Sequence, residues 1–221
     1  CLVGSEMCIR DSHTTVDRID YSNDTATAVA KGSLSLGKTY LRSTSNASFG
    51  YFGGGYNPAN VQSIVDRLDY SNDTANASPK GPLGQQKYTH AATGNADFGY
   101  HGSGLNHLGS KTSSVFRIDY SNDTATAAEK GPLSVTKDSL SATGSGSFGY
   151  FAGGSSPDPS RVDRLDYSND TATASPKGPL SVNRTMFAGT SSLENGITDL
   201  LLVPAPTIRD NVAPQGTDFG Y

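Results

Sequence analysis

Val65-Asp66-Arg67-Leu68-Asp69-Tyr70-Ser71-Asn72-Asp73-Thr74 is a stretch that occurs four times in the sequence with few changes. The copies begin at Val16, Val65, Val115 and Val162, with separations of 49, 50 and 47 residues. Lys-Gly and a leucine follow each copy, and Phe-Gly-Tyr recurs as a second landmark. This period is typical of a four-stranded unit and is long for leucine-rich or helical repeats. The chain is therefore predicted to be an array of similar β units.

The pattern within one unit predicts four short strands and no helix. Residues 65–70 have the period-two alternation and the composition of a strand. Because Asn and Asp favour turns, we expect Ser-Asn-Asp to lead directly into a partner strand beginning at Thr-Ala. Phe-Gly-Tyr-Phe is predicted as a strand near the centre of the array, where glycine permits close backbone approach. A further strand, exemplified by residues 140–144, leads to the next Phe-Gly-Tyr.

The order of these landmarks resembles the kelch family from about residue 14 to residue 187. Phe-Gly-Tyr-Phe with its following glycines is similar to the kelch strand that ends in a glycine doublet, and Lys-Gly-Pro-Leu-Ser resembles the proline-rich turn of that family. The resemblance implies an all-β, kelch-like β-propeller with four recognisable four-stranded blades in an incomplete ring. The chain departs from the family in having no Trp and in carrying Gly102-Ser103-Gly104 at the second junction. The units also resemble repeats of predicted virion and tail proteins of marine phages.

The sequence divides into three parts. Residues 1–12, which contain Cys1 and Cys8, share nothing with the repeats and resemble translated sequencing adaptor, so we expect an artefactual leader. A Cys1–Cys8 disulfide is the competing interpretation. Residues 13–190 hold the repeats, and residues 191–221 diverge before ending where a further blade would start. We therefore expect a fragment truncated at both ends.

Charge and hydropathy exclude two classes of partner. The formal net charge is -4 and only 17% of residues are charged, with no basic cluster suited to a phosphate backbone. Nucleic acid is therefore not an expected partner. No apolar run approaches the roughly 20 residues that span a bilayer, so membrane insertion is not expected either.

Arginine and aspartate lie two residues apart in every copy and so share one face of the strand. We expect them to form a ladder of ion pairs that locks neighbouring units, because a half-buried guanidinium needs a carboxylate partner. A ligand-binding rim is the alternative. The pairs are Arg18 and Asp20, Arg67 and Asp69, Arg117 and Asp119, and Arg164 and Asp166.

The Ser-Asn-Asp-Thr turns and the histidines offer the other candidate ligands. Clustered turn oxygens suit Ca²⁺, but the spacing is not that of an EF-hand, and Asn and Asp are also ordinary turn residues. His101 and His107 are expected to share one loop, without the third ligand that a transition metal needs. We therefore predict no metal site, no cofactor and no catalytic residue.

The predicted function is a non-catalytic structural or binding scaffold, either virion-associated or extracellular. Loops vary between units while strands repeat, so the loops over 56–63, 101–114 and 155–160 are expected to contact a protein or a glycan. The alternative is a fragment of a kelch-class enzyme, similar to the galactose oxidase propeller, whose catalytic residues lie outside this chain. The candidate contact residues are Tyr56, Asn57, His101, Asn106, His107 and Asp158.

Overall fold

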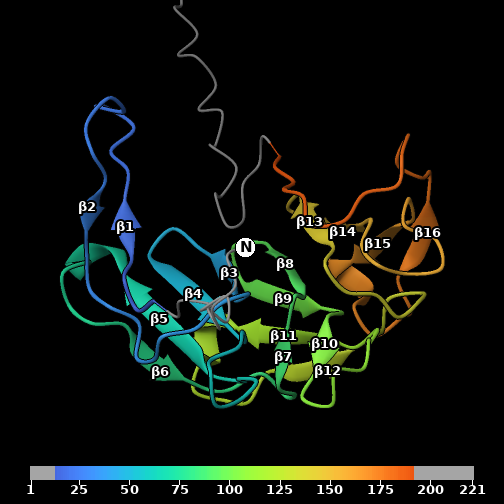
Figure 1. Ribbon diagram of the computed structural model, residues 1–221, viewed down its shortest axis with the longest axis horizontal. Helices are drawn as coiled ribbons and strands as arrows, with labels where there is room; N and C mark the ends of the chain where they lie inside the picture. Colours follow the sequence, from blue (N-terminus) through green and yellow to red (C-terminus); the bar gives the residue numbers. More distant parts are fainter. Residues whose placement is uncertain (1–12, 192–221) are drawn as a thin grey trace, which may run out of the picture.

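The computed structural model describes residues 13–191 (Figure 1). The predictions of a leader over 1–12 and of a divergent segment after residue 191 lie outside the described residues. We divide the described chain into a first unit (13–32), a second (33–81), a third (82–131) and a fourth (132–191). The units follow one another along an arc in Figure 1, from blue to orange.

The fold is all-β, as the sequence predicts. The second, third and fourth units each contain one four-stranded antiparallel sheet. The sheets are β3 (Arg42–Ser45), β4 (Phe49–Gly53), β5 (Val65–Asp69) and β6 (Ser78–Lys80); β8 (Ala91–Gly94), β9 (Phe98–Gly102), β11 (Val115–Asp119) and β12 (Ala128–Lys130); and β13 (Ser141–Gly144), β14 (Phe148–Ala152), β15 (Val162–Asp166) and β16 (Ser175–Lys177).

Two smaller sheets complete the described strands. The first unit is a ribbon of β1 (Asp17–Arg18) and β2 (Val29–Ala30), in which Arg18 is opposite Val29. In the third unit β7 (Lys87–Tyr88) pairs with β10 (Leu105–Asn106). No described helix is long and apolar enough to cross a bilayer.

The hairpin partner of the repeated strand begins later than predicted. In the second unit it starts at Ser78, opposite Arg67, and not at Thr74. A single turn of 3-10 helix (Tyr70–Asn72) intervenes, capped by the Asp69 side chain. The chain then contacts the start of its own unit, where the Ala77 backbone N–H donates to the Ser33 carbonyl at 2.9 Å. The first residues of the predicted strand are therefore used in a contact with the segment that precedes β3.

The innermost strand also differs from the prediction. Strands β3, β8 and β13 are edge strands of their sheets, and β8 packs against both β3 and β13. The Phe-Gly-Tyr strands lie second in each sheet. The glycine of each Phe-Gly-Tyr strand leaves room for a tyrosine side chain. A Cβ at Gly149, for example, would lie 2.8 Å from the hydroxyl of Tyr167.

A left-handed residue recurs before each inner strand. Tyr40, Thr89 and Ser139 have φ of 54°, 51° and 56°, a region that disfavours side chains, and Met186 repeats this conformation at 53°. The conformation lets the Ser139 N–H donate to the Thr89 carbonyl and the Met186 N–H to the Ser139 carbonyl, each at 2.8 Å. Backbone hydrogen bonds thus link one left-handed residue to the next along the chain and offset the local strain.

The apolar core lies between neighbouring sheets. One cluster joins the second and third units, and a second joins the third and fourth. The leucines of two Lys-Gly-Pro-Leu segments, Leu83 and Leu133, are buried in these clusters. The clusters include Tyr51, Val65, Leu83, Phe116 and Ile118 in the first, and Tyr100, Val115, Leu133, Leu140, Phe151 and Leu165 in the second.

Candidate binding surface

The repeated arginine reaches the following unit. Arg67 Nη1 donates to Asp123 Oδ2 at 2.7 Å, and Lys80 Nζ lies 3.7 Å from the other carboxylate oxygen. The buried Tyr51 hydroxyl donates to the same carboxylate at 3.2 Å. Burial and the neighbouring Asp123 charge raise the pKa of Tyr51 to about 12. We call this arrangement the ionic joint.

The ionic joint is repeated along the array. Between the third and fourth units, Arg117 donates to Asp170 at 2.7 Å and Lys130 lies 3.2 Å from it. Between the first and second units, Arg18 and Lys31 lie 2.6 and 3.1 Å from Asp73. A stacked tyrosine pair accompanies two of the joints, with ring centroids 4.6 and 4.8 Å apart. The pairs are Tyr51 with Tyr120 and Tyr100 with Tyr167.

The predicted ladder of pairs two residues apart is therefore corrected. The hydrogen-bonded carboxylate of Arg67 is Asp123, whereas Asp69 Oδ1 accepts from the N–H and hydroxyl of Ser71 at 2.8 and 2.7 Å. The Ser71 hydroxyl is the main cause of the lowered pKa of Asp69. Strand geometry puts Arg67 and Asp69 on one face, but the Asp69 carboxylate accepts hydrogen bonds from the following turn and caps it. Asp20, Asp119 and Asp166 cap their turns in the same way.

The Lys-Gly glycine completes the joint sterically. The Gly81 N–H donates to the Asp123 carbonyl at 2.8 Å. A Cβ at Gly81 would lie 1.9 Å from the Ala125 carbonyl oxygen, and one at Gly131 would lie equally close to the Ala172 oxygen. Glycine is therefore required where the next unit's turn is docked. The joint explains the repeated motif through packing between units.

The third unit differs from its neighbours in its interior. Lys38 and Lys137 are buried and lie 3.1 and 3.0 Å from Asp66 and Asp163. The equivalent Lys87 faces Phe116, with Nζ 4.6 Å from the ring centroid.

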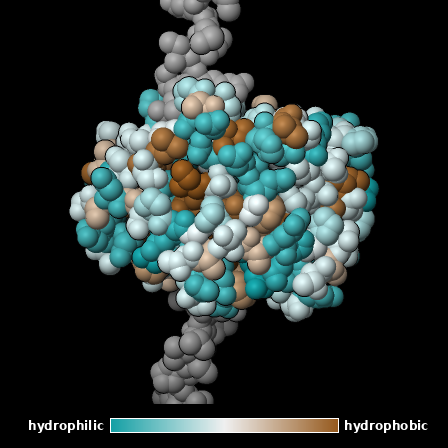
Figure 2. All heavy atoms as spheres, turned by 90° about the horizontal axis from the view of Figure 1, so that it is seen from below, coloured by the Kyte–Doolittle hydropathy of each residue, from teal (hydrophilic) through white to brown (hydrophobic). Residues whose placement is uncertain are grey.

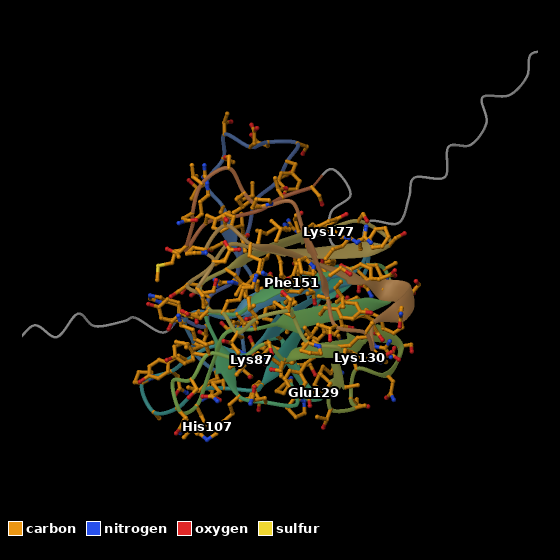
Figure 3. The ribbon with its side chains drawn as sticks, turned by 90° about the vertical axis from the view of Figure 1, so that its right-hand side faces the viewer. Lys87, His107, Glu129, Lys130, Phe151 and Lys177 are labelled. Atoms are coloured by element: carbon orange, nitrogen blue, oxygen red, sulfur yellow. The ribbon has the colours of Figure 1, made fainter. Side chains whose placement is uncertain are left out.

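Lys87 is held by carbonyls instead of a carboxylate. Its Nζ donates to the carbonyl oxygens of Ser103 and Ser114 at 3.1 and 3.2 Å. Burial lowers its pKa to about 7. Figure 3 shows Lys87 in the interior and His107 at the periphery. Its amine is enclosed, so it is not a reactive group at the surface.

His101 is corrected from a loop residue to a core residue. It lies in β9, is fully buried, and its Nδ1 is 3.0 Å from His90 Nε2. Burial lowers the pKa of His101 to about 3, so both rings are neutral near pH 7. The equivalent positions of the fourth unit hold Leu140 and Phe151, both in the core. The two histidines thus replace an apolar pair.

Three of the predicted contact residues shape their own loops. Asn57 Oδ1 accepts from the backbone N–H of Ala59 and Asn60 at 3.0 and 2.8 Å. Asn106 Oδ1 accepts from two N–H groups of its loop in the same way, and Asp158 Oδ1 accepts from Ser160. These oxygens are engaged, whereas His107 is exposed beside an equally exposed Leu108.

Tyr56 belongs to a cluster of tyrosines that the sequence did not reveal. Tyr88 lies between Tyr56 and Tyr40, with ring centroids 5.9 and 6.4 Å away and interplanar angles of 47° and 48°. All three side chains are half-buried. They come from two units and from three separate segments, of which the one with Tyr88 is strand β7, so only the folded array brings them together. Leu105, opposite Tyr88 in the β7–β10 pair, connects the cluster to the His107 loop.

On the face that Figure 2 shows, hydrophobic residues reach the surface in small groups between hydrophilic ones. A depression of about 400 Å³ lies between two turns. Its lining includes the polar residues Asp97 and Asp119 and the aromatic residues Phe98 and Tyr120. Within residues 13–191, no three His, Cys, Asp or Glu side chains are grouped to hold a metal ion.

Comparison with known proteins gives no relationship: no family model matches the chain, and no curated protein matches it.

Proposed function

We propose that this chain forms blades of a kelch-like β-propeller and serves as a non-catalytic scaffold that binds a glycan, in a virion or outside the cell. The side-by-side packing of β3, β8 and β13 and the repeated ionic joint support the propeller arrangement. A crystal structure in which these strands surround one axis would be the expected result, and strands in separate layers would contradict the arrangement.

The tyrosine cluster carries the binding proposal. A tyrosine presents an apolar ring face that packs against the C–H groups of a sugar, and a hydroxyl that hydrogen-bonds its hydroxyls. Tyr40, Tyr56 and Tyr88 present three such rings at angles to one another, which suits a curved saccharide better than a flat ring. Aromatic side chains on a rigid scaffold are also the residues that dominate binding energy.

The repeat indicates that folding does not need these tyrosines. The equivalents of Tyr40 and Tyr56 in the following unit are Thr89 and Leu105, and Thr89 has the same left-handed conformation as Tyr40. If folding required tyrosines at these positions, every unit would carry them. The cluster occurs at the boundary between the second and third units only, among the described units, as expected for a contact site.

The test uses substitutions that the protein already contains at equivalent positions. A glycan array is expected to identify ligands for the wild-type chain, and Tyr56→Leu combined with Tyr40→Thr should weaken binding at least about tenfold. The matched control is Tyr21→Ala, which removes an exposed tyrosine in the first unit and should leave binding unchanged. Failure of the wild-type chain to bind any glycan would overturn the proposal, as would binding that the double variant retains. Capture of a protein partner by the cluster would replace the glycan assignment.

A further inference from the structure

The ionic joint has a direction, and this gives the two ends of the array different chemistry. One unit contributes a donor side, made of an arginine, a lysine and the glycine after it. The following unit contributes an acceptor side, made of one aspartate in a Ser-Asn-Asp-Thr turn. The fourth unit should therefore have an open donor side and the first unit an open acceptor side.

The donor side of the fourth unit is open among the described residues. Arg164 and Lys177 are equivalent to Arg117 and Lys130 but form no ion pair within residues 13–191. The Arg164 guanidinium lies over the Phe148 ring at 4.3 Å, in the same pose as its equivalents. Its position is thus set before any acceptor arrives. Figure 3 views the molecule from this end, where Lys177 is labelled.

The surroundings of Gly178 also show that the donor side of the fourth unit is open among the described residues. It is equivalent to Gly81 and Gly131, at which a Cβ would collide with a carbonyl oxygen of the next unit 1.9 Å away. At Gly178 no atom of the described chain lies within 4 Å of the Cβ position. The surface that receives a turn in the preceding units is present here without its turn.

The acceptor side of the first unit is also open within the part of the chain that the structure describes, and its turn is already folded. Asp20 Oδ1 accepts from the Ser22 N–H and hydroxyl at 2.9 and 2.6 Å, as the equivalent aspartates do in the other units. Asp24, equivalent to Asp123 and Asp170, is exposed and has no ion pair among the described residues. Tyr21 is 92% exposed, whereas its equivalents Tyr120 and Tyr167 each stack on a tyrosine of the preceding unit.

We infer that the open donor side binds the turn over residues 20–26 of a second copy of this chain, forming a further ionic joint between molecules. The two surfaces carry opposite charges and the same groups that meet three times within the chain. They lie at opposite ends of the longest dimension of the molecule, so one chain in this conformation cannot join its own ends (Figure 1). Such contacts are head-to-tail, and they close into a ring or extend into a filament. The inference does not depend on the proposed glycan binding.

Association of the 221-residue chain in solution tests the inference. Sedimentation velocity at increasing protein concentration is expected to show species heavier than a monomer, and added salt should weaken them because the joint is ionic. Gly178→Ala should abolish association while leaving the monomer folded, since its Cβ meets no atom of residues 13–191. The matched control is Gly146→Ala, which also meets no atom within 4 Å and should associate as wild type does.

A mixing experiment separates this joint from other contacts. Asp24→Ala alters only the acceptor side and Gly178→Ala only the donor side, so each variant alone should be monomeric. An equimolar mixture should form a 1:1 dimer, because each partner contributes one intact side. A wild-type chain that stays monomeric at all concentrations would overturn the inference. Association that both variants retain would overturn it too, by showing that another surface is responsible.

Discussion

Replacing Asp123 with Asn should destabilise the protein through the charges that it leaves behind. Arg67, Lys80 and the Tyr51 hydroxyl all converge on this carboxylate. Their setting is only partly open to water, because 8% of the Asp123 side chain, 26% of Arg67 and 15% of Lys80 are exposed. Removing one partner of a fully buried pair costs about 3–5 kcal/mol, and partial exposure reduces that cost. We expect Asp123→Asn to lower the free energy of unfolding by about 2–3 kcal/mol.

Urea unfolding followed by circular dichroism and tyrosine fluorescence measures this loss, since the chain contains no Trp. Asp69→Asn is the matched control and should change stability little, because Asn caps a turn about as well as Asp. Combining Asp123→Asn with Arg67→Met should cost less than the sum of the single losses, since the second change removes an unpaired charge. A loss below about 0.5 kcal/mol for Asp123→Asn would refute the reasoning, because that is the range of exposed ion pairs.

The other sites give three further predictions. The neutral His90–His101 pair has pKa values depressed below the usual 6.5, so its stabilising contribution is present above that pH and is lost as the pH falls toward about 3. His90→Leu with His101→Phe should remove this acid sensitivity in thermal unfolding scans from pH 7 to pH 4, and an unchanged profile would contradict it. Phe116→Asp should raise the pKa of Lys87 above about 7, measured by amine NMR titration, because it supplies the carboxylate found beside the equivalent lysines. Gly131→Ala should lower the thermal midpoint markedly, because its Cβ would lie 1.9 Å from a backbone oxygen, and a midpoint like that of wild type would show that the joint can shift.

Local sequence patterns predicted much of the fold. Alternation placed β5, β11 and β15, and the Asn-Asp composition placed the turns after them. The boundary of the hairpin partner was not predictable in this way, because residues such as Ala77 bond to the start of their own unit, far earlier in the chain, and not to the neighbouring strand. The position of the inner strand depends on contacts between units, which periodicity along one strand cannot report.

The candidate sites were harder to predict than the strands. Every turn offers an aspartate, so the sequence alone could not distinguish Asp69 from Asp123 as the partner of Arg67. The tyrosine cluster was not predictable because Tyr40, Tyr56 and Tyr88 lie in separate segments that only the folded chain brings together. One signal was available in the sequence. When the units are aligned, three residues of the third unit, His90, His101 and Phe116, differ in type from their equivalents in the other units. The other units carry one type of residue at each of these three positions. The joint change in the third unit therefore indicates that its interior side chains differ as a group.

The uniform chemistry of the ionic joint has a consequence for how such a gene can change. Each joint uses the same charged groups, so duplication or loss of one whole repeat by recombination would leave an arginine opposite an aspartate at every remaining joint. A break inside a unit would instead separate an arginine from its lysine and glycine. The length of the array can therefore vary between relatives in steps of one repeat, and designed arrays of chosen length can be assembled by joining copies at the Lys-Gly segment.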